Sequence, residues 1–145
     1  MAEFVYKLME TEDELQGANE VKRQVFVIEQ GITEELVFQS AEESDEINII
    51  VKNDSMVVGT ARVVFPANDT AKIERMAVLR SFRRRGIGKG IISFLLGELK
   101  RKKIKNIILH AQYQVYDFYK TYGFNVSGLP FMEAGIKHVK MEMRY

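Results

Sequence analysis

The residues with the clearest chemical meaning form a short basic turn that contains two glycines. The turn, Arg83-Arg84-Arg85-Gly86-Ile87-Gly88-Lys89, separates a strand-like run over residues 71–79 from an amphipathic helical run over 88–101. The first N–H groups of a helix have no partner inside it, and they carry the positive end of the helix dipole. Glycine lets a ligand approach this backbone closely, while the basic side chains add positive charge. The turn therefore predicts a phosphate-binding site built from main-chain amides at residues 84–89.

Two better-known phosphate loops do not fit this turn. A Walker A loop requires serine or threonine after its Gly-Lys pair, but Gly90 follows Lys89. A dinucleotide-binding fingerprint requires a third glycine where Ile91 stands. A glycine-rich turn is by itself a weak signal. The alternative interpretation is a solvent-exposed basic helix start whose glycines serve only the bend of the chain.

Composition restricts the class of protein. A chain of 145 residues, 46% hydrophobic and 28% charged, is typical of one globular domain. The 21 basic and 20 acidic side chains give a net charge of +1, which disfavours nucleic-acid binding by bulk charge. Cysteine is absent, and two histidines without cysteine give little basis for a metal site. The acidic first residues and the short apolar runs predict a cytoplasmic protein without a membrane span.

The spacing of apolar residues predicts a mixed α/β domain with the element order βα(α)βββαβαβ. A strand over 4–8 precedes a capping box, Thr11 to Glu14, which begins a helix that ends near Glu29, with Gly31 after it. A short helix within 32–41 follows. The remaining elements, in chain order, are strands over 46–52 and 57–65, a turn over 66–69, a strand over 70–79, a helix over 88–101, a strand over 107–109, a helix over 113–122 and a strand over 138–145.

Three of these elements carry packing predictions. The helix over 88–101 repeats apolar residues four apart, so that its apolar stripe must pack on a sheet. The run over 107–109 is wholly apolar, which favours a central strand covered on both faces. In the helix over 113–122 we expect the inward-facing residues to be Val115, Phe118 and Tyr122.

Three features together resemble the GNAT superfamily of acyl-CoA-dependent N-acetyltransferases. The turn fits the pattern Arg/Gln-x-x-Gly-x-Gly/Ala, with Arg83, Gly86 and Gly88 in the fixed places. The run Phe118-Tyr119-Lys120-Thr121-Tyr122-Gly123-Phe124 is similar to the second signature of the family. The element order matches over nearly the whole chain. The resemblance implies one GNAT domain over residues 1–145, with a central mixed sheet flanked by helices.

Two further segments resemble the ElaA-type branch of the superfamily. They are Arg23-Gln24-Val25-Phe26-Val27-Ile28-Glu29-Gln30 and Gly135-Ile136-Lys137-His138. The chain departs from the branch at Lys137, where proline is usual, and from many family members at Gln112, where asparagine is common. Glutamine can make the same amide hydrogen bonds from a longer side chain.

The resemblance implies acetyl-CoA as the cofactor, with CoA as the product. In such proteins the turn holds the CoA diphosphate, and the pantetheine arm pairs with the preceding strand. That strand separates from the next one, and the thioester lies in the gap between them. The cofactor-binding residues implied in this chain are Met76, Ala77, Val78, Arg83, Arg84, Arg85, Gly86, Ile87, Gly88, Lys89, Gln112 and Phe118.

Amide formation from a thioester requires a proton acceptor for the amine and benefits from a proton donor for the departing thiolate. The resemblance assigns the donor role to Tyr119. Glu74 is the first candidate for the base, because strand alternation places it on the face of Met76 and Val78. The alternative role for Glu74 is an ion pair with a nearby arginine, either Arg62 or Arg75.

His110 and His138 are alternative bases, and a structural role is the competing interpretation for each. The end of the first helix borders the acceptor pocket in this architecture. We therefore expect contacts to the acceptor from Arg23, Glu29, Gln30 and His138.

The predicted function is transfer of an acetyl group to a primary amine of a small molecule or a protein. The alternative is a non-catalytic acyl-CoA-binding sensor. A nucleic-acid-binding role for the basic run 80–105 is disfavoured because no aromatic stacking residues interleave its charges in the way such sites use them. A homodimer through sheet edges is compatible with the sequence, and no metal is expected.

Overall fold

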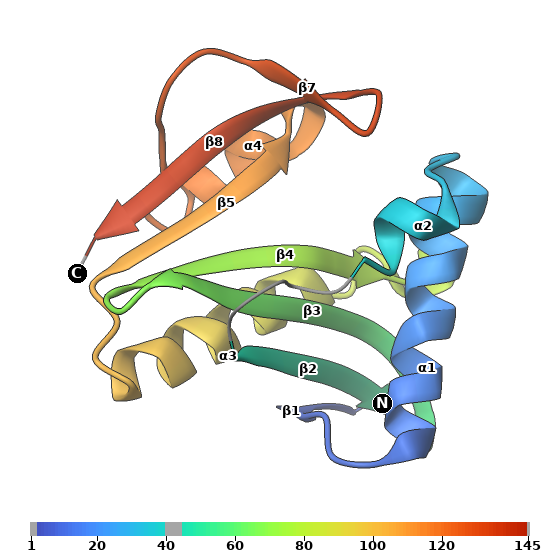
Figure 1. Ribbon diagram of the computed structural model, residues 1–145. Helices are drawn as coiled ribbons and strands as arrows, with labels where there is room; N and C mark the ends of the chain where they lie inside the picture. The colour runs from blue at the N-terminus through green and yellow to red at the C-terminus, as the bar shows by residue number, and fades with distance from the viewer. Residues whose placement is uncertain (1–2, 40–44, 145) are drawn as a thin grey trace.

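The computed structural model describes residues 3–39 and 45–144, which form an open mixed sheet flanked by helices (Figure 1). The strand order is β1-β2-β3-β4-β5-β8-β6, and β7 also pairs with β8. This arrangement confirms the predicted mixed α/β fold. The strands are β1 (Phe4–Leu8), β2 (Glu46–Asn53), β3 (Met56–Ala67), β4 (Thr70–Val78), β5 (Asn106–Gln112), β6 (Asn125–Val126), β7 (Phe131–Glu133) and β8 (Ile136–Arg144).

The helices lie on both faces of the sheet. One face carries α1 (Glu12–Lys22), its π-helical continuation η1 (Arg23–Glu29) and α2 (Glu34–Val37). We call it the acceptor face. The other face is covered by α3 (Ile87–Arg101) and α4 (Tyr116–Lys120), and two 3₁₀ turns, η2 (Arg80–Phe82) and η3 (Tyr113–Val115), precede these helices. Figure 1 shows α1 and α3 on opposite sides of the strands.

The sheet separates in its middle, between β4 and β5. These two strands are parallel and pair only from Thr70↔Asn106 to Ile73↔Leu109. Beyond these residues β4 continues along β3, while β5 continues along β8. Figure 1 shows the distance between the two ribbons increasing toward their carboxyl ends. The predicted gap between the two strands is therefore present.

A β-bulge interrupts β4 where this separation begins. Thr60 pairs with Ala77 and Arg62 with Glu74, so two residues of β4 stand opposite Ala61 alone. Arg75, the first of them, has a φ of 55°, which is unusual outside glycine. Because the extra residue reverses the alternation, the residues of β4 after the bulge face the opposite side from the one that a regular strand predicts.

Local sequence signals account for most of the helices. The capping box is confirmed, since Thr11 Oγ1 accepts from the N–H of Glu14 and the Glu14 carboxylate accepts from the N–H of Thr11. Gly31 ends η1 with a φ of 71°. The apolar stripe of α3 packs against the sheet as predicted, with exposed fractions of 1% or less for Ile87, Ile91, Ile92, Leu95 and Leu99.

Several details of the prediction were wrong. The helix expected over 113–122 is a 3₁₀ turn followed by the five residues of α4, because valine and aromatic residues are weak helix formers in so short a segment. Val115 is consequently 49% exposed instead of inward-facing. Ile108 is only half-buried between buried neighbours, so β5 is not fully covered on both faces. Pro66 belongs to β3, not to the turn. Tyr145, the last residue of the predicted final strand, is outside the described residues.

Candidate active site

The basic turn connects the end of β4 to the start of α3. Gly86 precedes α3 with a φ of 77° and contacts nothing on the side where a Cβ would stand. The first α-helical bond of α3 runs from the N–H of Gly90 to the carbonyl of Gly86. The preceding amides therefore have no acceptor within the helix. Arg84, Arg85 and Lys89 are exposed beside them, so the turn has the geometry and charge of an anion site.

The second predicted motif packs directly on this turn. A Cβ at Gly88 would lie 3.5 Å from Cζ of Phe118 in α4, which places the Phe118 ring against the first turn of α3. Tyr6 of β1 is in close contact with Gly90, two residues further along α3. The small residues of the turn thus let aromatic side chains from two distant segments fix its position.

Arg83 is engaged by the protein itself. Its Nε donates to the carbonyl of Val78 at 3.0 Å, and its two terminal nitrogens donate to both carboxylate oxygens of Glu29 at 2.8 and 2.9 Å. This bidentate pair joins the end of η1 to the turn. Arg83 and Glu29, predicted as cofactor and acceptor contacts respectively, are therefore bonded to each other.

Gln30, the residue that follows η1, contacts the other side of the gap. The side-chain amide of Gln112, at the end of β5, donates to the side-chain oxygen of Gln30 at 2.9 Å. Glu29 and Gln30 therefore connect η1 to the ends of both separated strands. Arg23 lies apart from them, since it pairs with Glu20 and Glu34 and its guanidinium stacks on Phe38.

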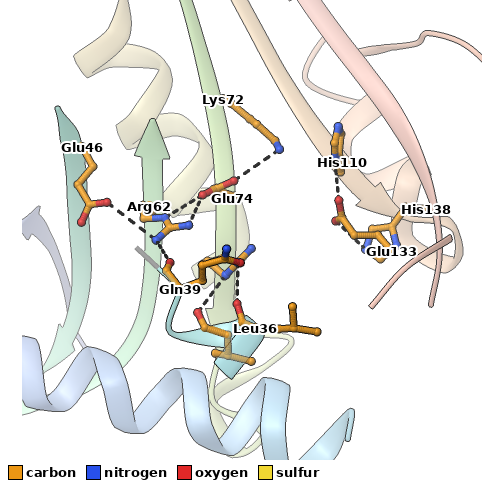
Figure 2. A network of polar contacts seen from close by, with 11 residues as sticks. Leu36, Gln39, Glu46, Arg62, Lys72, Glu74, His110, Glu133 and His138 are labelled. Atoms are coloured by element: carbon orange, nitrogen blue, oxygen red, sulfur yellow. Dashed lines mark hydrogen bonds and ion pairs between the residues drawn. The ribbon is translucent and has the colours of Figure 1, made fainter. Parts of the chain in front are cut away.

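Glu74 does not share the strand face of Met76 and Val78, which corrects the prediction from alternation. Ile73 before the bulge and Met76 and Val78 after it all pack in the α3-side core. Glu74 instead points to the acceptor face, where the bulge places it on the other side from Met76 (Figure 2).

On the acceptor face, the Glu74 carboxylate is held by a buried arginine. Arg62 Nε donates to Oε1 of Glu74 at 2.8 Å, Arg62 Nη2 donates to the same oxygen, and Arg62 Nη1 donates to the carbonyl of Gln39. Lys72 Nζ lies 3.6 Å from the other oxygen. Figure 2 shows this network. The alternative prediction, an ion pair of Glu74 with Arg62, is thus present in the structure.

Tyr119 lies in α4 beside Phe118. Its ring makes edge contacts with Phe118 and Phe124, at centroid distances of 5.0 and 6.2 Å. Burial raises the pKa of the Tyr119 phenol to about 12. The hydroxyl is therefore protonated at neutral pH and can serve as a hydrogen-bond or proton donor.

A carboxylate that sequence reasoning missed lies between the two histidines. Glu133 of β7 is 3.0 Å from His110 Nδ1 of β5 through one oxygen and 3.7 Å from His138 Nε2 of β8 through the other. The β7–β8 turn, Ala134-Gly135, has positive φ at both residues. The common hairpin signals are Asn-Gly, Asp-Gly and Gly-Gly, so Ala134-Gly135 gives only the glycine as a hint of the hairpin that places Glu133 beside the last strand.

Residues 3–39 and 45–144 show neither a metal-binding cluster nor a membrane-spanning helix. No group of three or more histidine, cysteine or acidic residues there is arranged to hold a metal ion. In the same part of the chain, no helix is long and apolar enough to span a membrane.

A family model for the acetyltransferase (GNAT) domain matches residues 8–145. The chain belongs to the GNAT family. Two relatives come from Bacillus subtilis (strain 168). YyaT is 36% identical over 143 residues, which is 93% of this chain and 92% of YyaT. The N-acetyltransferase YjcF is 33% identical over 135 residues, which is 92% of this chain and 95% of YjcF.

Solved structures agree with this GNAT assignment at the level of the fold. ElaA from Escherichia coli superposes with a TM-score of 0.85 and 21% identity, covering 99% of this chain and 100% of ElaA. A GNAT acetyltransferase from Elizabethkingia anophelis with acetyl-CoA bound has a TM-score of 0.74 and 16% identity, covering 98% of each chain. The predicted similarity to ElaA is confirmed for the fold. Family and fold together support acyl transfer as the general activity of this GNAT protein.

Proposed function

We propose that this protein transfers an acetyl group from acetyl-CoA to a primary amine of a small molecule or a protein, within a ternary complex in the cytoplasm. The observation that carries the proposal is the separation of β4 from β5 beyond Ile73, with the exposed turn at the end of β4. Such a gap offers one strand's main chain to an extended ligand, while the turn offers amides to its phosphates.

In this proposal the diphosphate binds the main-chain amides of residues 84–89, and Arg84, Arg85 and Lys89 add charge. Arg83 holds the turn through Val78 and Glu29. The arm of the cofactor extends along β4 at Met76, Ala77 and Val78 and passes Phe118, which packs on Gly88. Gln112 and Gln30 lie at the far side of the gap. A structural neighbour that holds acetyl-CoA supports this choice of ligand.

The chemistry follows from the groups on the two sides of the gap. The amine nitrogen attacks the thioester carbonyl, the carbon–sulfur bond breaks, and the departing thiolate takes a proton from the phenol of Tyr119. Burial raises the pKa of the Tyr119 phenol to about 12, so the group is protonated at neutral pH. The acceptor enters from the opposite face, where Glu74, His110 and His138 are the candidate proton acceptors (Figure 2).

The test is a thiol-release assay with acetyl-CoA and a panel of amino acids, polyamines, aminoglycosides and lysine peptides. We expect release with at least one amine and a loss of about 100-fold or more in kcat for Tyr119→Phe. Tyr122→Phe is the matched control, because Tyr122 also contacts Phe118 but is not assigned to the reaction. Equal rates for the two variants would remove Tyr119 from the mechanism.

The sensor alternative is separated by calorimetry with acetyl-CoA. Tight binding without thiol release for any amine would favour a non-catalytic role. If folded protein does not bind acetyl-CoA at all, both functions are wrong.

A further inference from the structure

We infer that His110 is the proton acceptor for the incoming amine and that Glu133 is the residue that orients it. This inference rests on the proposed function, because it assigns one step of that reaction. It also assigns a role to Glu133, a residue to which the sequence analysis gave none.

Position is the first argument for His110. The last β4–β5 pair is Ile73↔Leu109. His110 is thus the first residue of β5 beyond the paired region, just as Glu74 is on β4. Leu109 and Ala111 are buried in the α3-side core, so His110 faces the acceptor side. Figure 2 shows Lys72 and Glu74 on one strand and His110 on the next, with their side chains on the same face.

Hydrogen bonding fixes which ring nitrogen is available. The Glu133 carboxylate is only an acceptor, so the 3.0 Å contact is a hydrogen bond donated by His110 Nδ1–H. In the neutral ring Nε2 then carries the lone pair. Phe131 contacts the His110 ring edge-on at 4.9 Å and restricts its rotation. These contacts therefore fix which ring atom of His110 can act as the base.

Glu133 has the charge that this role requires. Its hydrogen bond with His110 is the main cause that lowers the pKa of the Glu133 carboxyl, against the opposing effect of partial burial. An ionised carboxylate on Nδ1–H stabilises the imidazolium that forms when Nε2 takes up a proton.

His138 has a different position. Its Nδ1 donates to the carbonyl of Ile136 at 2.7 Å, its ring stacks on Phe131, and only 8% of its side chain is exposed. It lies on β8, one strand further from the gap than His110. We therefore do not assign the proton transfer to His138. Glu74, the other candidate, is already held by Arg62 in a buried ion pair.

The proton balance is simple. The ammonium of the acceptor transfers one proton to His110 Nε2 and becomes a nucleophilic amine. After attack, Tyr119 protonates the departing thiolate, the second proton of the nitrogen restores the Tyr119 phenol, and the proton held by His110 passes to solvent. The His110 side chain is 25% exposed, which gives that proton a direct route out.

The kinetic test uses His110→Gln, Glu133→Gln and the control Glu98→Gln, which removes a carboxylate from α3 on the other side of the sheet. We expect His110→Gln to lower kcat by about 100-fold or more at pH 7, with the dissociation constant for acetyl-CoA unchanged. The deficit should shrink as pH rises, because more of the amine is then deprotonated without help. Imidazole should partly restore His110→Ala. The charged groups that face His110, and that accompany its titration, are Glu133, His138, Lys72, Glu74 and Lys140.

A second measurement does not depend on turnover. Long-range ¹H–¹⁵N spectra of the native protein should show His110 with Nδ1 protonated and Nε2 unprotonated, and Glu133→Gln should change this signature while Glu98→Gln should not. An Nε2–H tautomer in the native protein would overturn the inference. If the native protein is active and His110→Gln has the same kcat, the inference is overturned while the proposed function stands. If the native protein releases no thiol with any amine, both are overturned.

Discussion

Two glycines of α3 allow the packing around the basic turn to be tested by the same chemical change. A Cβ on Gly90 would lie 2.5 Å from Cε2 of Tyr6 and closer still to the end of that ring, whereas a Cβ on Gly97 would meet nothing within 4 Å. Gly97→Ala should therefore stabilise the protein by about 1 kcal/mol, the ordinary gain in helix propensity. Gly90→Ala gains the same propensity but must displace the Tyr6 ring.

The size of the difference follows from the overlap. Carbon atoms normally approach to about 3.5–4.0 Å, so the ring must retreat by roughly 1 Å or more. Overpacking of this kind costs about 1–3 kcal/mol. Gly90→Ala should thus melt below Gly97→Ala by roughly 2–12 °C in a calorimetric scan, since each kcal/mol shifts the Tm by about 2–4 °C in a domain near this size.

A double-mutant cycle tests the cause. Tyr6→Ala removes the ring, so that Gly90→Ala on that background should show the same gain as Gly97→Ala. The coupling free energy between positions 6 and 90 should then equal the overpacking cost of about 1–3 kcal/mol. Equal melting temperatures for the two alanine variants, or additive effects in the cycle, would refute the packing argument.

Two further predictions concern the ends of helices. Glu14 has its pKa lowered from 4.5 to about 2, first by its hydrogen bond with Lys7 and then by the N–H of Glu10, so its contribution to stability is complete above pH 4.5 and is lost as the pH falls toward 2. The Tm difference between the native protein and Glu14→Gln should shrink over that range; a constant difference would contradict the assignment. Gly86→Ala meets no atom within 4 Å but must keep a φ of 77°, so it should cost about 1–2 kcal/mol in urea unfolding, and no loss would mean that the turn is not held in this conformation.

The sequence was sufficient to predict the elements whose signals are local. The capping box at Thr11, the apolar stripe of α3 and the alternation in β8 each depend on residues a few positions apart. The contact between Phe118 and Gly88 joins distant segments, and it was not predicted, although the resemblance assigned both residues to cofactor binding.

What the sequence did not predict depends on pairing between segments. The sequence gives no signal for the bulge at Arg75, because a non-glycine residue occupies the positive φ. This one conformation places the residues after it on the opposite face from Glu74, where alternation had predicted a shared face. The pairs Arg83–Glu29 and Gln112–Gln30 join residues 54 and 82 positions apart. Glu133 was missed because it becomes adjacent to His110 only through the register of β7, β8 and β5.

On the proposed function, the separation of β4 from β5 makes the length of the acyl donor a condition for reaction. The main chain of an unpaired strand edge binds an extended partner through the spacing of the partner's amide groups. The partner therefore needs no side chains to be recognised. On the proposed function, the segment from the bulge at Arg75 to Gly86 sets the distance that the arm between phosphate and thioester must span. Donors that differ only in the acyl group would then still place their carbonyl correctly. A donor with a shortened arm would bind by its phosphates but would not transfer its acyl group, because its carbonyl would not reach the acceptor.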